Sequence, residues 1–422
     1  MPESSNVTPL WEQRLVRNER DGSVKASAHN LMTVLENHEA WAGLFQLNEF
    51  SQKISMTGDP PYPGADPTEF STVDATEIAA WFGRPETYGI NVKSSMVTEV
   101  VEAVARRNKV HPVREYLEGL IWDGTERLPT LFSDFFGTVQ DDYTARVGVM
   151  FALSAVARIL QPGCKVDTMV VLEGRQGIGK TQAVRHLFSP PWYAEAQESP
   201  QSKDFYQSLH GRWGVEIGEM HSFTKGEVTK VKQAISAQSD VYRPSYGRYA
   251  REFPRQCVFV GTTNDRHYLR DHTGGRRFLP IAAKEVDRDG LISVRDQIWA
   301  EAVARYKRGE QWHELPPDAS AIQDERYQED AWSEPIRDWL AGEGKESSYP
   351  ADSPNLEYHD EDIGGVKRVT TSLIMKHALG IETAKHTRQD QMRVSSVMQH
   401  LGWDQRRVGK LRTRMWEQEG RE

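Results

Sequence analysis

The sequence predicts an α/β protein whose central sheet alternates with helices, between an N-terminal helical domain and a small C-terminal domain. Short apolar runs typical of buried strands occur at 168–172, 213–217, 257–261 and 277–281, and helical patterns alternate with them. A glycine-rich turn joins the first of these runs directly to a helical pattern. The chain has 422 residues, which at about 150 residues per domain leaves room for two or three domains.

Changes of pattern along the chain predict the domain boundaries. Residues 1–28 lack sustained periodicity and are expected to form a flexible N-terminal arm, although a strand-forming leader fits the same segment. Residues 29–135 carry several helical patterns, which predict an N-terminal helical domain. Residues 136–320 hold the alternation of strands and helices, and residues 321–422 form a C-terminal region. A polar, acidic segment at about 341–365 is expected to be a linker.

The end of the chain differs in charge from the rest. From residue 366 onward there are 12 basic and 6 acidic residues. A helical pattern there is followed by a basic segment expected to end in a strand, which suits a small winged-helix-like domain. Such a domain can contact duplex DNA or dock a partner.

Overall composition excludes several classes of protein. Acidic residues outnumber basic ones, 61 against 52, so nucleic acid must be bound where basic residues gather locally. No apolar run is long enough to span a membrane, and the acidic N-terminus does not have the pattern of a signal peptide. Two cysteines, Cys164 and Cys257, are too few for a disulfide framework and fit small buried apolar positions. We therefore expect an intracellular protein without membrane contact.

The glycine-rich turn matches the phosphate-binding pattern G-x-x-x-x-G-K-[ST], with a strand before it and a helix after it. Backbone N–H groups of such a loop can surround a phosphate, and the helix N-terminus adds a positive dipole. Lys180 is expected to reach the β- and γ-phosphates of ATP, and Thr181 to bind Mg²⁺. The predicted nucleotide-binding residues are Gly174, Gln176, Gly177, Ile178, Gly179, Lys180, Thr181 and Gln182.

Polar residues at the ends of later strands complete this expected site. Glu216 and Glu219 belong to the next strand, and each can polarise a water or lie beside Mg²⁺. Glu219 is the better candidate for catalysis, whereas Glu216 fits a metal-site role, an indirect role or a solvent-facing position equally well. Asn264 ends the third strand, where its amide can orient the attacking water.

Two adjacent arginines, Arg276 and Arg277, follow a Gly-Gly turn far from the glycine-rich loop. They suit an arginine finger that stabilises transition-state charge from a neighbouring subunit. A salt-bridged surface pair is the alternative.

A basic and aromatic segment lies between the second and third strands. Tyrosines alternate with arginines around a glycine, as expected of a hairpin that offers charge and stacking to single-stranded DNA. A solvated loop is the alternative, and Arg243 can instead face a nucleotide in a neighbouring subunit. The predicted DNA-binding residues are Lys230, Lys232, Arg243, Arg248, Tyr249 and Arg251.

Taken together, these blocks resemble the virulence-associated protein E family of phage and mobile-element proteins, related to the superfamily 3 helicases of the AAA+ class. The resemblance rests on HPVREYLEGLIWDGTERL, PGCKVDTMVVLEGRQGIGKT, WGVEIGEM, VKQAISAQSDVYRPSYGR, VGTTNDRHYLRDHTGGRRFLPI and DQIWAEA, which span about residues 108–315. It implies a Walker A loop at 174–181, a Walker B glutamate at Glu219, a sensor at Asn264 and a finger at Arg276 or Arg277. The sequence departs from the family because WGVEIGEM lacks an adjacent acidic pair, which leaves the roles of Glu216 and Glu219 open.

The resemblance implies an ATP-dependent DNA helicase or translocase that acts in replication as a ring, often hexameric, on single-stranded or forked DNA in a bacterial host. Many relatives carry an upstream primase-polymerase domain, but residues 1–107 are too short for one and lack its paired carboxylates. A separate primase or replisome partner is therefore expected. The main alternative is an ATP-switched initiator or loader that binds DNA without unwinding it. A small-molecule kinase and a DNA-sensing NTPase are more distant alternatives.

Overall fold

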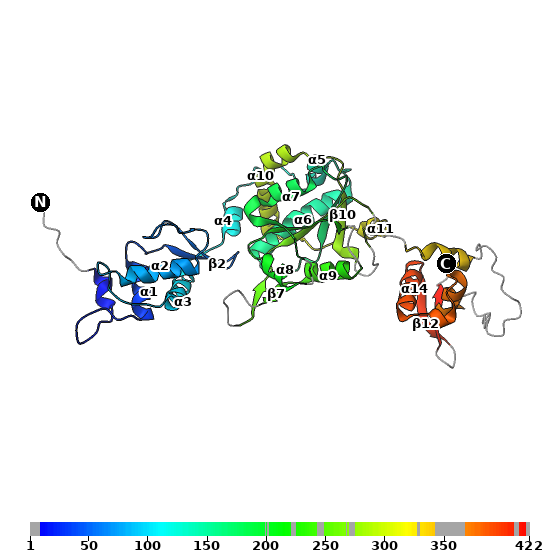
Figure 1. The fold of residues 1–422 in the computed structure, drawn as a ribbon. Helices are drawn as coiled ribbons and strands as arrows, with labels where there is room; N and C mark the ends of the chain where they lie inside the picture. Colours follow the sequence, from blue (N-terminus) through cyan, green and yellow to red (C-terminus); the bar gives the residue numbers. More distant parts are fainter. Residues whose placement is uncertain are drawn as a thin grey trace.

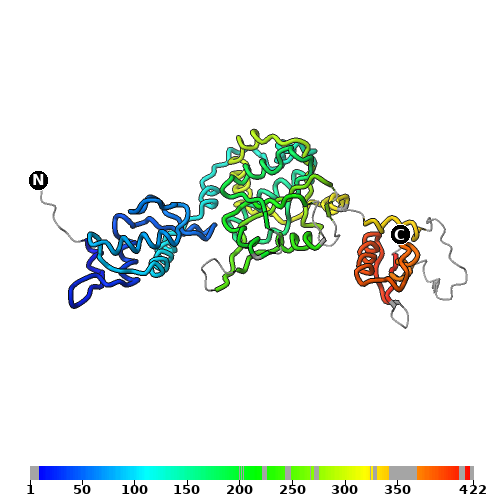
Figure 2. The backbone as a smooth tube through the Cα atoms, viewed as in Figure 1, coloured from blue at the N-terminus to red at the C-terminus, as the bar shows by residue number. Residues whose placement is uncertain are grey.

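The computed structural model describes residues 9–198, 200, 202–220, 225–242, 249–266, 268–269, 275–326, 330–341, 368–408 and 413–418. The chain forms an N-terminal, a central and a C-terminal body (Figure 1). Figure 2 follows the backbone through them in the order of the sequence. The expected linker at 341–365 lies outside the described residues except for residue 341.

The N-terminal body combines the expected helices with a small sheet that the helical patterns did not predict. Its sheet has the order β2-β1-β3, with β1 antiparallel to β2 and parallel to β3. Phe45 and Leu47 alternate with less buried residues along β1, which explains why this short run forms a half-buried strand. The elements are a 3₁₀ helix at Leu10–Arg14, α1 (Ala28–Asn37), β1 (Phe45–Asn48), β2 (Lys53–Met56), α2 (Thr72–Gly83), α3 (Ser94–Ala105) and β3 (Lys109–Val110).

The described part of the expected N-terminal arm, residues 9–28, packs onto this body. Leu15 and Val24 are buried in its hydrophobic core, and Arg17 pairs with Val24 in an isolated β-bridge. The buried Asn30 side chain holds the segment through the backbone of Val16 and Lys25. A side-chain amide thus supplies hydrogen bonds that sequence periodicity does not reveal.

The central body is built on a five-stranded sheet, and the four apolar runs in the sequence lie at β4, β6, β9 and β10. Its order is β10-β4-β9-β6-β5, and every neighbouring pair is parallel. Strand β5 is an additional edge strand that the apolar pattern did not indicate. The elements are α4 (Pro112–Gly119), α5 (Leu131–Phe136), α6 (Asp142–Leu160), β4 (Met169–Glu173), α7 (Lys180–Phe188), a 3₁₀ turn (Pro190–Trp192), β5 (Tyr193–Glu195), α8 (Lys203–Ser208), β6 (Gly214–Ile217), α9 (Lys225–Ser236), β7 (Ser239–Tyr242), β8 (Arg251–Pro254), β9 (Val258–Thr263), a 3₁₀ turn (Gly275–Arg277), β10 (Phe278–Ala282), α10 (Arg288–Lys307) and α11 (Ala319–Asp324).

Helices cover both faces of this sheet. Alternate residues of β4 divide between two cores: Val170 and Leu172 pack with α6, α7 and α10, whereas Met169 and Val171 pack with α8 and α9. The strands therefore read as continuous apolar runs, which is typical of a parallel sheet. Cys164 and Cys257 are both buried and free.

Residues 112–135, which the sequence assigned to the N-terminal domain, pack with the central body. Leu117, Leu128 and Phe132 belong to the same core as α6 and α10. The helical pattern at 113–121 corresponds to α4, but periodicity does not reveal which core an apolar face joins.

Among the described helices, only α6 is long and apolar enough to span a membrane, and 83% of its apolar window is buried inside the protein. It is therefore the central helix of the α6, α7 and α10 core.

The C-terminal body packs three helical segments against a three-stranded sheet of order β11-β13-β12. Its core contains Ile336, Val394, Trp403 and Trp416. The elements are α12 (Ser333–Ala341), β11 (Arg368–Val369), α13 (Thr371–Leu373) continued by a π-helical turn at Ile374–Ala378, a 3₁₀ turn at Thr383–Lys385, α14 (Arg388–His400), β12 (Trp403–Val408) and β13 (Thr413–Gln418).

Candidate nucleotide site

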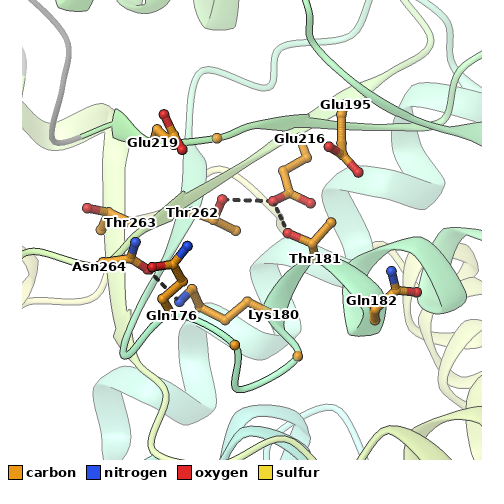
Figure 3. A pocket seen from close by; sticks show the side chains of 13 residues that line it. Gln176, Lys180, Thr181, Gln182, Glu195, Glu216, Glu219, Thr262, Thr263 and Asn264 are labelled. Atoms are coloured by element: carbon orange, nitrogen blue, oxygen red, sulfur yellow. Dashed lines mark hydrogen bonds between the residues drawn. The ribbon is translucent and has the colours of Figure 1, made fainter.

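A cavity of about 410 Å³ opens at the carboxyl ends of β4, β6 and β9. This is the edge at which parallel α/β sheets bind ligands, and the volume suits a small organic ligand. Figure 3 shows side chains from the glycine-rich loop, α7 and the strand ends converging on it. The lining residues are Gln176, Gly177, Gly179, Lys180, Thr181, Gln182, Glu195, Glu216, Gly218, Glu219, Thr262, Thr263 and Asn264.

The loop between β4 and α7 requires glycine at specific positions. Gly179 precedes α7 with φ of 99°, a left-handed conformation that other residues rarely adopt. A Cβ at Gly174 would lie 2.4 Å from the carbonyl oxygen of Ala283, so only glycine permits this close approach of two backbones. Gly174 and Ile178 thus shape the loop without lining the cavity.

Lys180, at the first position of α7, is 7% exposed. Its Nζ donates to the carbonyl oxygens of Gly174 (2.6 Å) and Arg175 (3.0 Å) and to Oδ1 of Asn264 (3.2 Å). These three acceptors are uncharged, and within the described part of the chain no carboxylate forms an ion pair with Lys180. Burial lowers the pKa of this ammonium group. A cation buried on neutral oxygens is prepared to receive an anion from the cavity.

Glu216 points toward the N-terminal end of α7 (Figure 3). It is 2% exposed, so the solvent-facing alternative was wrong. One carboxylate oxygen accepts from Thr181 Oγ1 and Thr262 Oγ1, both at 2.7 Å, and the other accepts from the Tyr193 hydroxyl at 2.6 Å. Gly214 faces the same side, and its missing side chain allows Phe188 of α7 to pack closely against the strand.

Glu219 and Asn264 also line the cavity. Glu219 follows β6 in a left-handed backbone conformation (φ 51°), and its side chain lies on the Thr263 side of the cavity in Figure 3. The two glutamates therefore occupy different positions: Glu216 accepts a hydrogen bond from Thr181 of α7, whereas Glu219 lies on the Thr263 side of the cavity.

Sequence reasoning missed Tyr193, Glu195, Thr262 and Thr263. The hydroxyl pair directly before Asn264 was a signal for the threonines, since strand-terminal polar residues gather at one sheet edge. Tyr193 and Glu195 had no such signal because their strand has only three residues.

The residues present fit ATP with Mg²⁺. The loop and Lys180 provide the groups that hold phosphates, and Thr181 retains hydroxyl lone pairs for a cation. The described residues contain no cluster of three or more His, Cys, Asp or Glu side chains suited to a metal. Mg²⁺ typically binds through one or two protein groups together with phosphate oxygens and water, and the Thr181 hydroxyl can be one such group.

Arg276 and Arg277 do not line the cavity of their own chain. Arg276 is exposed, and Arg277 Nε donates to Ser236 Oγ, at the end of α9, at 2.6 Å. The structure thus brings the loop, Glu216, Glu219 and Asn264 together, whereas the two arginines lie outside this cavity.

The predicted hairpin has two described strands, β7 and β8, which pair in antiparallel register from Ser239↔Pro254 to Tyr242↔Arg251. Tyr249 is 78% exposed and Arg251 is exposed. Arg243 and Arg248 lie outside the described residues.

The two lysines on α9 differ in position. Lys230 is exposed, but Lys232 is buried beside the inward-facing apolar side chains of α9. The prediction that Lys232 contacts DNA was therefore wrong for this conformation.

The fold and the cavity define a parallel α/β protein with a glycine-rich loop prepared for an anion. A family profile described as the virulence-associated protein E-like domain matches residues 117–331, about half of the chain. The chain belongs to this family, as its sequence blocks indicated.

Solved structures provide a more distant comparison. One apo structure of the NrS-1 C-terminal region (residues 305–718) has 12% identity and a TM-score of 0.48, covering 88% of this chain and 95% of that chain. Another apo form of the same region has 14% identity and a TM-score of 0.46, covering 93% and 99%. No curated protein matches the chain.

Proposed function

We propose that the central body is an ATPase of the AAA+ class, related to the superfamily 3 helicases. The observation that carries this proposal is the convergence of Lys180, Thr181 and Glu216 at the carboxyl edge of the sheet. A buried cation on neutral acceptors and a hydroxyl held by a buried carboxylate are the two partners that a Mg²⁺-bound triphosphate requires.

Glu219 is the proposed general base for the attacking water. Its place in the cavity wall, on the same side as Thr263 and Asn264, supports this role. Asn264 already contacts Lys180 Nζ, which supports a role in sensing the γ-phosphate. Bound Mg²⁺ would supply charge neutralisation of the phosphate oxygens.

The proposed assembly is a homo-oligomeric ring, hexameric by family resemblance, in which Arg276 or Arg277 acts on the neighbouring subunit's nucleotide. Their position outside the cavity of their own chain supports action in trans. Mixing Lys180→Ala subunits with Arg276→Ala or Arg277→Ala subunits should then restore part of the ATPase rate. The absence of rescue with both arginine variants would contradict the trans arrangement.

The β7–β8 hairpin is the proposed contact for single-stranded DNA. The exposed side chains of Tyr249 and Arg251 offer stacking and charge, and Lys230 adds a cation on α9. Movement of this hairpin with the nucleotide state would make the protein a DNA translocase.

The C-terminal body is proposed to be a winged-helix-like domain that contacts duplex DNA. Arg407 and Arg414 are direct partners across the β12–β13 hairpin, and both are exposed. Like charges opposite one another destabilise a hairpin, so a polyanion that neutralises both is a suitable ligand.

In the proposed setting, the protein replicates the DNA of a phage or mobile element in the cytoplasm of a bacterial host, with a separate primase or replisome partner. The alternative remains an initiator or loader that uses ATP as a switch. That alternative shares the cavity, and differs in lacking directional strand separation.

ATP hydrolysis with Mg²⁺, with and without single-stranded DNA, tests the proposal. The wild type should hydrolyse ATP faster with DNA present, and Glu219→Gln should bind nucleotide while losing turnover by about 10²-fold or more, as expected for a lost general base. A wild type that binds ATP but never hydrolyses it would refute the ATPase proposal.

A further inference from the structure

The proposed ATPase mechanism assigns no role to Tyr193, which contacts Glu216 from outside the lining of the cavity. It lies on the edge strand β5, is 7% exposed, and its hydroxyl is 2.6 Å from Glu216 Oε2. The register of the sheet pairs β5 with β6, so that the strand bearing Tyr193 lies next to the strand bearing Glu216.

The two carboxylate oxygens of Glu216 accept hydrogen bonds from different residues. Oε1 accepts from Thr181 and Thr262, and Oε2 accepts from Tyr193. The carboxylate therefore has a donor at each end, which fixes its rotation about the final side-chain bond. Without the Tyr193 donor, Oε2 would be buried with one partner fewer, and the carboxylate would be free to turn.

Tyr193 is always the donor in this pair. An ionised carboxylate can only accept hydrogen bonds, so the phenol O–H of Tyr193 donates to Glu216 Oε2.

The orientation of Glu216 determines what Thr181 can offer. The Thr181 hydroxyl uses its only proton on Glu216, so its oxygen lone pairs remain available for a cation. A rotated Glu216 would let the hydroxyl turn, and the lone pairs would no longer be held toward the cavity.

We propose that Tyr193 is a positioning residue for Mg²⁺: it holds Glu216 so that Thr181 presents its oxygen to the cation. This inference rests on the proposed nucleotide site and names a residue that acts on the metal through two others. Removing a residue that orients the ligands of a metal typically weakens metal affinity by about 10- to 100-fold.

The test compares Tyr193→Phe with Tyr62→Phe. Tyr62 has the same 7% exposure and its hydroxyl also donates to a carboxylate, Asp74 at 3.0 Å, but it lies in the N-terminal body. A fluorescent ADP analogue is titrated at equilibrium, first in EDTA and then with increasing Mg²⁺. This readout is independent of turnover.

For Tyr193→Phe we expect an unchanged ADP affinity in EDTA, because the phosphate loop is intact. The Mg²⁺ midpoint, the concentration that produces half of the Mg²⁺-dependent change in binding of the ADP analogue, should rise by about 10-fold or more. Tyr62→Phe should change neither quantity. An unchanged Mg²⁺ midpoint in Tyr193→Phe would overturn the inference.

A second variant, Thr262→Val, removes another donor to the same carboxylate while keeping the side-chain volume. Because Tyr193 and Thr262 both act through Glu216, the double variant should raise the Mg²⁺ midpoint by less than the product of the single effects. Independent, multiplicative effects would contradict positioning through Glu216. If the wild type binds Mg²⁺ in this titration but does not hydrolyse ATP, the ATPase proposal is refuted while the role of Tyr193 in Mg²⁺ binding is not.

Discussion

The ion pair between Glu173 and Arg326 fastens the segment after α11 to the last residue of β4, directly before the glycine-rich loop. Arg326 Nε and Nη2 lie 3.1 and 3.3 Å from the two oxygens of Glu173. The glutamate side chain is 2% exposed and the arginine side chain 11% exposed. Removing Arg326 would therefore leave the buried Glu173 carboxylate without its charged partner.

Arg326→Met should destabilise the central body by about 3–5 kcal/mol, the usual cost of leaving one buried charge of a pair behind. For a body of this size, the loss corresponds to a fall in Tm of roughly 6–20 °C. Calorimetry, or denaturant unfolding followed by tryptophan fluorescence, measures it. Adding Glu173→Gln should recover most of the loss, because the uncompensated charge is removed.

The free energy of unfolding lost in Arg326→Met should also depend on pH. Burial already raises the pKa of Glu173 above its ordinary value of 4.5 despite the arginine. The folded state then holds more protons than the unfolded state between the unfolded and folded pKa values, so this group lowers stability as pH rises through that window. Without Arg326, the pKa of Glu173 in the folded state rises further. The pH range over which this carboxyl lowers stability then extends to higher pH. The variant should therefore lose more stability at pH 8 than at pH 5, and an equal loss at both would refute the reasoning.

Two further predictions concern the core and the hairpin. Gly148→Ala should destabilise the protein by about 1–3 kcal/mol in denaturant unfolding, because a Cβ would lie 2.4 Å from the Leu128 carbonyl oxygen and overpack α6; a more stable variant would mean that helix propensity prevails. Replacing Arg248 and Arg251 together by alanine should reduce the slope of log affinity for single-stranded DNA against log salt by about 1.4, since each phosphate contact contributes about 0.7. An unchanged slope would place the DNA contact elsewhere.

Local sequence signals predicted the centre of the fold well. The strand before the glycine-rich loop and the helix after it lie at Met169–Glu173 and Lys180–Phe188. Glycine spacing and an apolar run are local properties, so a single sequence contains them. The other long strands of the sheet were located for the same reason.

The surroundings of Glu216 depend on strand order, which is not local. Tyr193 and Thr262 come from β5 and β9, the two strands that flank β6. Alternation also failed to place Glu216, because both faces of the sheet are covered and neither side of β6 faces water. Similarly, a short strand such as β1 and a tethering arginine such as Arg326 depend on distant partners.

Strand displacement on forked duplexes with a 3′ or a 5′ tail, in the presence of ATP and Mg²⁺, tests the proposed motor most directly. Lys180→Ala is the control, because it removes the cation proposed to hold the phosphates. The account predicts that the wild type separates one of the two forks and the variant neither. DNA-stimulated hydrolysis without separation of either fork would contradict the motor and favour the loader, and separation by Lys180→Ala would contradict the assignment of the nucleotide site.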